Sequence, residues 1–156
     1  MALKTDRIHI DSQIDYFMNE TAERGGIVSV STVGSGSAMD QASQLATYKA
    51  VASGVKPLGV LMCDVVDNDL LRQHENWHKE EVQIGGKVTI WSKCTVVTNR
   101  IVGTPTAGSL AYVGPSGLIS PTVYQTDHTG GASTPIGRFL STKDEEGFAK
   151  VAVNLP

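Results

Sequence analysis

The chain of 156 residues has no long apolar run, no basic patch and few aromatic side chains. No stretch approaches the roughly 20 apolar residues that a membrane-spanning helix needs, and the N-terminus lacks an apolar signal core. The thirteen Lys and Arg are scattered singly against sixteen Asp and Glu, whereas nucleic-acid-binding proteins usually carry a basic stripe. We therefore expect a soluble protein, made in the cytoplasm, that binds neither a membrane nor nucleic acid.

Cysteine is also scarce. Cys63 and Cys94 are the two cysteines, they do not form a C-x-x-C pair, and each lies in an apolar run. This setting predicts two buried free thiols rather than a disulfide or a metal site.

One short motif with a chemical meaning is present at residues 74–78, which read H-E-N-W-H and so match H-E-x-x-H. On a helix, His74 and His78 would lie on one face and share a zinc ion, and Glu75 would act as general base on the metal-bound water. A zinc metallopeptidase is therefore one hypothesis for the function.

The surroundings of this motif favour a structural role instead. A catalytic zinc site needs a third protein ligand, and the extended motif would place Gly at 81 and His at 84, where this chain has Glu81 and Ile84. From residue 82 to residue 125 there is no Asp, Glu or His. We therefore expect no metal, no cofactor and no catalytic residues.

Most of the chain shows short apolar stretches of strand-like period, separated by Gly, Pro, Ser and Asp turns. Many short strands joined by turns predict a mainly β protein, a small β-barrel or β-sandwich. Two stretches, Pro57–Leu61 and Pro135–Leu140, share a proline followed by a glycine and are candidates for equivalent strands. The expected strands are Ile27–Val33, Leu45–Ala50, Pro57–Val66, Val88–Thr98, Ser109–Val113, Leu118–Ser120, Ile136–Ser141 and Phe148–Leu155.

The first 26 residues are expected to form an arm, with residues 27–156 as the domain. A capping-box pattern at Ser12–Asp15 precedes apolar residues at helical spacing, and Gly25-Gly26 ends the pattern, so a short helix is predicted in the arm. Its apolar side chains must be covered by the domain or by another chain. The candidate contacts to another chain, taken from this arm, are Ile8, Ile10, Ile14, Phe17 and Met18.

Several blocks of the sequence resemble head decoration (cement) proteins of tailed bacteriophages. The resemblance extends over most of the chain, and the blocks that carry it are residues 19–26, 59–66, 72–74, 76–79, 81–89, 107–117 and 136–140.

The resemblance implies a non-enzymatic structural protein of the virion, synthesised in the host cytoplasm and bound to the outer capsid surface. Its implied partners are the major capsid protein and itself, as a homotrimer, and its implied role is to clamp neighbouring capsid subunits and so stabilise the capsid. A glycan-binding β module is a further alternative. It would need exposed aromatic rings on one face, and the sequence does not group Trp91, Tyr112 and Tyr124.

Overall fold

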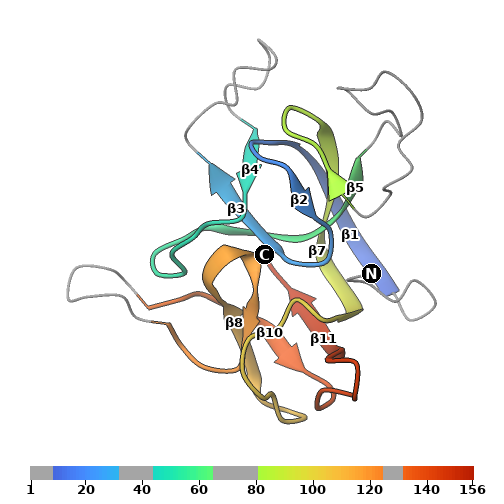
Figure 1. Ribbon diagram of the computed structural model, residues 1–156, viewed down its shortest axis with the longest axis vertical. Coiled ribbons are helices and arrows are strands. Elements are labelled where there is room, and N and C mark those ends of the chain that lie inside the picture. Colours follow the sequence, from blue (N-terminus) through green and yellow to red (C-terminus); the bar gives the residue numbers. More distant parts are fainter. Residues whose placement is uncertain (1–8, 32–43, 65–80, 125–131) are drawn as a thin grey trace.

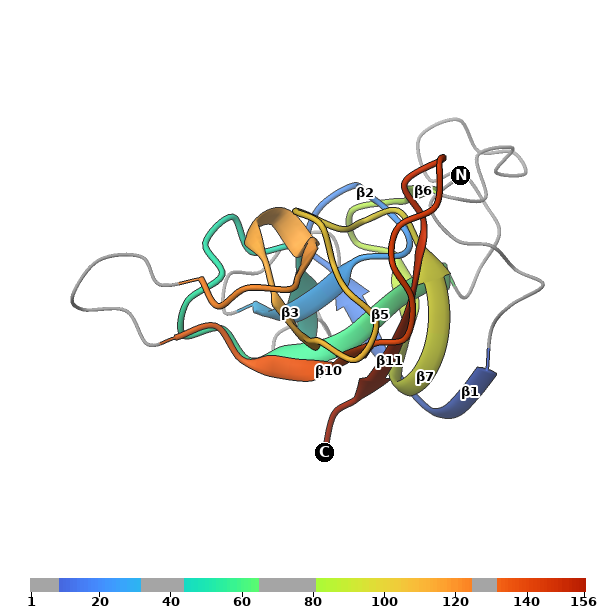
Figure 2. The same cartoon turned by 90° about the horizontal axis from the view of Figure 1, so that it is seen from below.

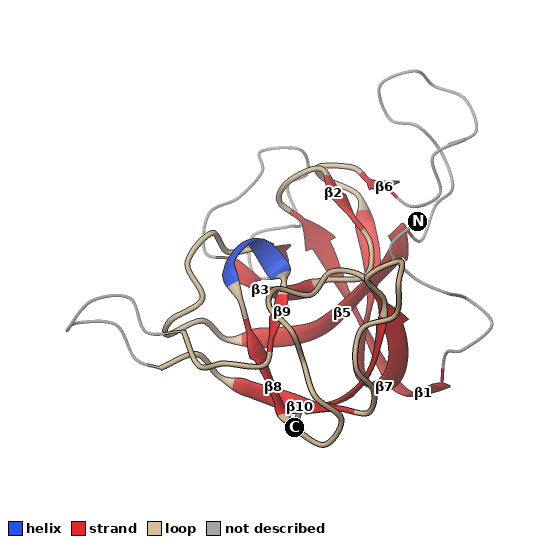
Figure 3. Ribbon diagram, turned by 60° about the horizontal axis from the view of Figure 1, so that its bottom comes forward, coloured by secondary structure: helices blue, strands red, loops and turns tan. Residues whose placement is uncertain are grey.

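The computed structural model describes residues 9–31, 44–64, 81–124 and 132–156. The chain is mainly β, as predicted, and all eight expected strands are present, several with different ends. The predicted ends of two strands, residues 32–33 and 65–66, lie outside the described residues. Strands dominate Figure 3, where the short helical turn η3 is the blue segment. The elements are β1 (His9–Met18), β2 (Ala22–Glu23), β3 (Ile27–Ser31), β4 (Leu45–Thr47), β5 (Pro57–Asp64), β6 (Glu81–Val82), β7 (Lys87–Thr98), β8 (Leu110–Val113), η3 (Pro115–Gly117), β9 (Ile119–Ser120), β10 (Pro135–Phe139) and β11 (Ala149–Asn154).

Five strands form a closed ring in the first half of the chain. The order is β1-β4-β3-β5-β7, and β7 pairs back onto β1, so the ring has no free edge. The β1–β4 pairing is parallel and the other four are antiparallel. We call this the first barrel; it occupies the upper part of Figure 1.

A second ring follows and uses the same long strand. The C-terminal part of β7 pairs with β11, and the order continues β11-β10-β8-β9. Ile101, just after β7, then forms a parallel bridge with Ile119 in β9, which closes the ring. We call this the second barrel; Figure 1 shows β8, β10 and β11 below the first barrel, and Figure 2 shows β7 and β11 side by side.

The two barrels have the same topology. Each begins with a hairpin, β3-β4 in the first barrel and β8-β9 in the second. The next strand of the barrel, β5 or β10, pairs with the first strand of the hairpin. The last strand, β7 or β11, then pairs with β5 or β10. In each, the chain segment before the hairpin pairs in parallel with the hairpin's second strand. The chain is thus a tandem repeat of one five-strand unit, with β7 ending the first unit and beginning the second.

Hydrogen bonds repeat at equivalent positions. Leu61 exchanges backbone bonds with Gly25 and Gly26, both 2.9 Å. Phe139 exchanges the same two bonds with Gly108 and Ser109, both 2.8 Å. The matching pair of Pro-x-Gly strands is therefore β5 and β10, one in each barrel.

The predicted helix in the N-terminal arm is wrong. Residues 9–18 form β1, a strand of the main sheet that pairs with β7 and β4. Ile14, Tyr16 and Met18 alternate with the exposed Gln13 and Asp15, which is the period-two pattern of a strand with one buried face. Burial of this face in the barrel interior stabilises the strand more than the capping-box pattern stabilises a helix.

Two hydrophobic clusters make up the core. The first barrel encloses Met18, Val28, Leu61, Val88 and Ile90, with Val82 of the small β2–β6 sheet packed among them. The larger cluster fills the second barrel and extends to the outer face of the first, so the two units share one continuous core region. Among the described residues, no helix is long and apolar enough to cross a membrane.

Candidate binding surfaces

A polar cluster centred on Tyr48 joins the two barrels. The Tyr48 hydroxyl donates to the carbonyl of Glu23 (2.7 Å) and accepts from the backbone N–H of Gly26 (3.0 Å). The Arg100 guanidinium lies 5.2 Å from the centre of the Tyr48 ring and 3.8 Å from the Glu23 carboxylate. Burial is the main reason that the pKa of Tyr48 is raised above its ordinary value, while the Gly26 bond and Arg100 act in the opposite direction.

The same cluster leaves no space for a side chain at Gly26 or Gly117. A Cβ on Gly117 would lie 2.2 Å from the Tyr48 ring, and one on Gly26 would lie 2.6 Å from the Gly117 carbonyl oxygen. The Glu20 carboxylate accepts from Thr47 Oγ1 and from the Tyr48 backbone N–H, both at 2.5 Å. These contacts fix the segment that follows β4 and indicate a structural role for the cluster.

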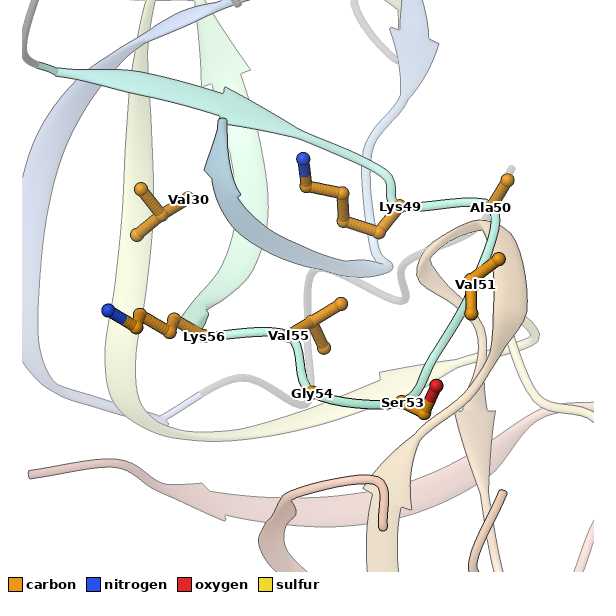
Figure 4. A pocket seen from close by; sticks show the side chains of 8 residues that line it. All are labelled: Val30, Lys49, Ala50, Val51, Ser53, Gly54, Val55 and Lys56. Atoms are coloured by element: carbon orange, nitrogen blue, oxygen red, sulfur yellow. The ribbon is translucent and has the colours of Figure 1, made fainter. Parts of the chain in front are cut away.

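The loop of residues 49–56 forms the wall of a hollow of about 560 Å³. Three hydrogen bonds hold its backbone: Ser116 N–H to the Lys49 carbonyl, Thr134 Oγ1 to Val55, and Val30 N–H to Lys56. Figure 4 shows Lys49 and Lys56 near the two ends of this loop, with valine side chains between them. The hollow therefore combines an apolar wall with two cations.

A second hollow, of about 470 Å³, lies on the outer side of the second barrel. Leu110, with 54% of its surface exposed, faces Arg138 across the β8–β10 pairing, and Arg138 faces Ala152 across the β10–β11 pairing. The hollow is lined by Leu110, Pro135, Ile136, Gly137, Arg138, Ala152 and Asn154.

The residues predicted as capsid or inter-subunit contacts lie in different environments. Met18 is fully buried in the first barrel, Ile14 packs against the same cluster, and Phe17 is half-buried. Ile10 is 42% exposed, opposite Cys94 in β7. Ile8 lies outside the described residues. The exposed apolar surface of this strand is therefore at its N-terminal end.

The H-E-x-x-H motif, with His74, Glu75 and His78, lies outside the described residues. In the parts of the chain that are described, no three His, Cys, Asp or Glu side chains are grouped so that they could hold a metal ion. Neither cysteine is in a disulfide, as predicted; Cys94 is buried as expected, whereas Cys63 is half-buried rather than buried. Burial, and then the charge of Asp11, raise the pKa of the Cys94 thiol to about 12, which keeps it protonated at neutral pH.

The aromatic residues considered for a glycan surface do not all reach the surface. Trp91 is only 3% exposed and is part of the larger core cluster, while Tyr112 and Tyr124 are half-buried. Trp91 is therefore a core residue and is not available for stacking against a sugar.

No sequence pattern predicted the Tyr48 cluster or either hollow. Glu20, Glu23, Tyr48 and Arg100 come from segments up to 80 residues apart, and none has a neighbouring motif. The repeated Pro-x-Gly pattern was the one sequence signal near either hollow, because it lies in β10, which lines the second hollow.

No protein-family model matches the chain. No curated protein matches it either.

Proposed function

We propose that this chain is a structural protein that decorates the outer surface of a bacteriophage capsid and clamps neighbouring capsid subunits. One observation carries the proposal: several of the segments that resemble phage decoration proteins form strands of the two barrels. Residues 59–64 lie in β5, 81–89 span β6 and the start of β7, 107–117 span β8 and η3, and 136–140 cover most of β10. The mainly β fold that the resemblance implies is also the fold of the chain.

The architecture suits a clamp. Closed rings leave few unpaired strand edges, so the body is rigid and resists edge-to-edge aggregation. A clamp acts through apolar area buried against its partner and through repetition over many equivalent sites, and it needs no reactive group. Exposed apolar side chains are available on both barrels, among them Ile10, Val51 and Leu110.

Co-sedimentation tests the proposal. Purified full-length protein is mixed with mature capsid shells, assembled without it from the major capsid protein of the virus that encodes the chain. We expect saturable binding with a fixed number of copies per shell. Failure to sediment with these shells at any protein concentration contradicts the proposal.

The zinc metallopeptidase remains the second candidate, favoured by the H-E-x-x-H sequence itself. Under this alternative, Glu75→Gln abolishes zinc-dependent peptide hydrolysis and leaves capsid binding untouched. Under the decoration proposal, neither the wild-type protein nor this variant hydrolyses peptides, and both bind capsid shells equally.

A further inference from the structure

The hollow beside the loop of residues 49–56 has the size and the wall of a small-molecule site. Its volume of about 560 Å³ lies within the range of roughly 300–1,000 Å³ that is typical of ligand pockets. Its apolar lining consists of Val30, Ala50, Val51 and Val55. Ligand pockets are mostly apolar with a few placed polar groups, and this hollow follows that pattern.

Hydrogen bonds to other segments fix the shape of the hollow before any ligand arrives. At one end of the loop the Ser116 N–H donates to the Lys49 carbonyl (2.7 Å), and at the other end the Val30 N–H donates to the Lys56 carbonyl (2.9 Å). Ala52 anchors the middle of the loop, because only 2% of its surface is exposed. Binding to a hollow that is already formed costs little conformational entropy.

The charge of the hollow is positive. Lys49 and Lys56 line it, and no carboxylate is among its described lining residues. Neither lysine forms an ion pair with any side chain of the described ranges. The Glu20 carboxylate, which contacts the residues just before the loop, accepts from Thr47 Oγ1 and from the Tyr48 backbone N–H instead. Two ammonium groups beside an apolar wall therefore favour an anionic ligand.

The lining argues against a sugar as this ligand. Ser53 is the only neutral side chain with a hydrogen-bonding group among the described lining residues, and none of these residues is aromatic. The hydroxyl groups of a sugar would lose hydrogen bonds to water against this wall without gaining others. A ligand with a hydrocarbon body has no such hydrogen bonds to lose.

We propose that this hollow binds a small apolar anion, a molecule with a hydrocarbon body and one carboxylate group. The valine side chains cover the hydrocarbon, which removes apolar surface of both partners from water. Figure 4 shows the two lysine side chains starting from the two ends of the loop, on either side of Val55. Each ends in a point charge on a flexible stem, which pairs with the carboxylate. Such a site would exist whether or not the chain decorates a capsid.

Octanoate is the probe, and the valine methyl NMR signals of the isotope-labelled, full-length protein report where it binds. We expect saturable shifts of the Val30, Val51 and Val55 signals in titrations kept below the concentration at which octanoate forms micelles. Octanol has the same chain length without the charge, and acetate has the charge without the chain. Both should bind more weakly than octanoate, by about threefold or more, because each lacks one of the two contributions.

Variants separate the two contributions within the protein. Lys49→Gln combined with Lys56→Gln should weaken octanoate binding by about threefold or more and leave octanol binding unchanged. Val51→Asp should weaken octanoate binding by about fivefold or more, because an aspartate repels the carboxylate and removes apolar contact. Val51 is 52% exposed, so the fold should be retained, which thermal unfolding checks.

Matched controls lie on the second barrel. Lys93→Gln combined with Lys150→Gln removes two exposed lysines, and Leu110→Asp changes an apolar side chain that is 54% exposed. These variants should bind octanoate like the wild-type protein. Valine signals of the hollow that do not shift with octanoate overturn the inference. Equal affinities for octanoate and octanol, or an octanoate affinity that the two lysine changes leave unaltered, overturn it as well.

Discussion

Gly59 and Gly137 are the residues in which the internal repeat is most visible. Each follows a proline by two positions, has a φ of +150° or +158°, and lies beside a register shift in its strand pairing. A Cβ would lie 2.2 Å from the Trp91 carbonyl oxygen in the first case and 1.9 Å from that of Ala152 in the second. Both glycines allow two strands to approach more closely than any other residue permits.

Replacement of Gly137 by alanine should therefore destabilise the protein strongly. The backbone angle and the contact with a carbonyl oxygen both oppose a side chain, and we expect a loss of about 3 kcal/mol or more. Gly54→Ala is the control: Gly54 has a φ of +67°, but nothing lies within 4 Å of its added Cβ, so the loss should be about 1 kcal/mol. Denaturant unfolding measures both; equal losses would show that the close strand approach is not what requires Gly137.

We expect Cys94 and Tyr48 to lower the free energy of unfolding at alkaline pH. Both groups have a higher pKa in the folded protein than when unfolded, chiefly because of burial. The stabilisation from such a group is fully present below the unfolded pKa and is lost as the pH rises toward the folded pKa. For Cys94 this window runs from 9.0 to about 12.

We expect the free energy of unfolding to fall through this window, by up to about 1.4 kcal/mol per pH unit for each group. Cys94→Ala removes one of the two groups, so its stability should fall less steeply with pH than that of the wild-type protein. Denaturant unfolding at a series of pH values tests this. Parallel slopes for the two proteins would exclude Cys94 as a source of the pH dependence.

At the level of strands, much of the fold follows from the sequence. The eight predicted strands have either alternating or wholly apolar stretches ended by Gly, Pro or Asp turns, and these local signals suffice. β2 and β6, two residues each, are too short for any period to appear. The closure of the two rings through β7 depends on pairings between residues that are distant in sequence. No local sequence pattern predicts such pairings.

β1 shows how a local pattern misleads. Ile14, Phe17 and Met18 have helical spacing, and the capping-box residues before them strengthen that interpretation. Tyr16 carries the other pattern, because Ile14, Tyr16 and Met18 together fit a strand. Tertiary pairing with β7 and β4 decides between the two.

The position of each side chain on β1 separates a core role from a contact role. Met18→Ala should cost about 2–5 kcal/mol, because Met18 is fully buried in the first barrel. Ile10→Ala should change stability by less than about 0.5 kcal/mol, because 42% of Ile10 is exposed. Thermal unfolding distinguishes them, and a large loss for Ile10→Ala would mean that this end of β1 is part of the core.

The candidate surfaces were less predictable than the strands. The loop of residues 49–56 is held by bonds from Ser116, Thr134 and Val30, which are distant in sequence. Leu110 and Arg138 become neighbours only when β8 and β10 pair. Sequence patterns describe what one segment prefers, whereas these surfaces arise from the contact of several segments.

At the scale of the whole molecule, β7 makes the two barrels interdependent. Its N-terminal part pairs with β5 and its C-terminal part with β11, while β1 lies along the opposite edge. Neither ring can open without disturbing a strand of the other. The larger core cluster also contains residues of both barrels.

The protein should consequently unfold in a single cooperative transition. Gly59→Ala in the first barrel and Gly137→Ala in the second should each lower the temperature of that one transition, because β7 couples the units. Differential scanning calorimetry gives the result. Two resolved transitions, each moved by only one of the variants, would show that the barrels are independent domains.

The clamping role is tested most directly by the heat stability of capsid shells with and without bound protein. Binding to the intact shell but not to separated subunits must stabilise the shell by mass action. We predict that calorimetry of saturated shells shows disassembly at a higher temperature than that of bare shells, with a rise that grows with occupancy. Shells that bind the protein yet disassemble at the same temperature would contradict the account.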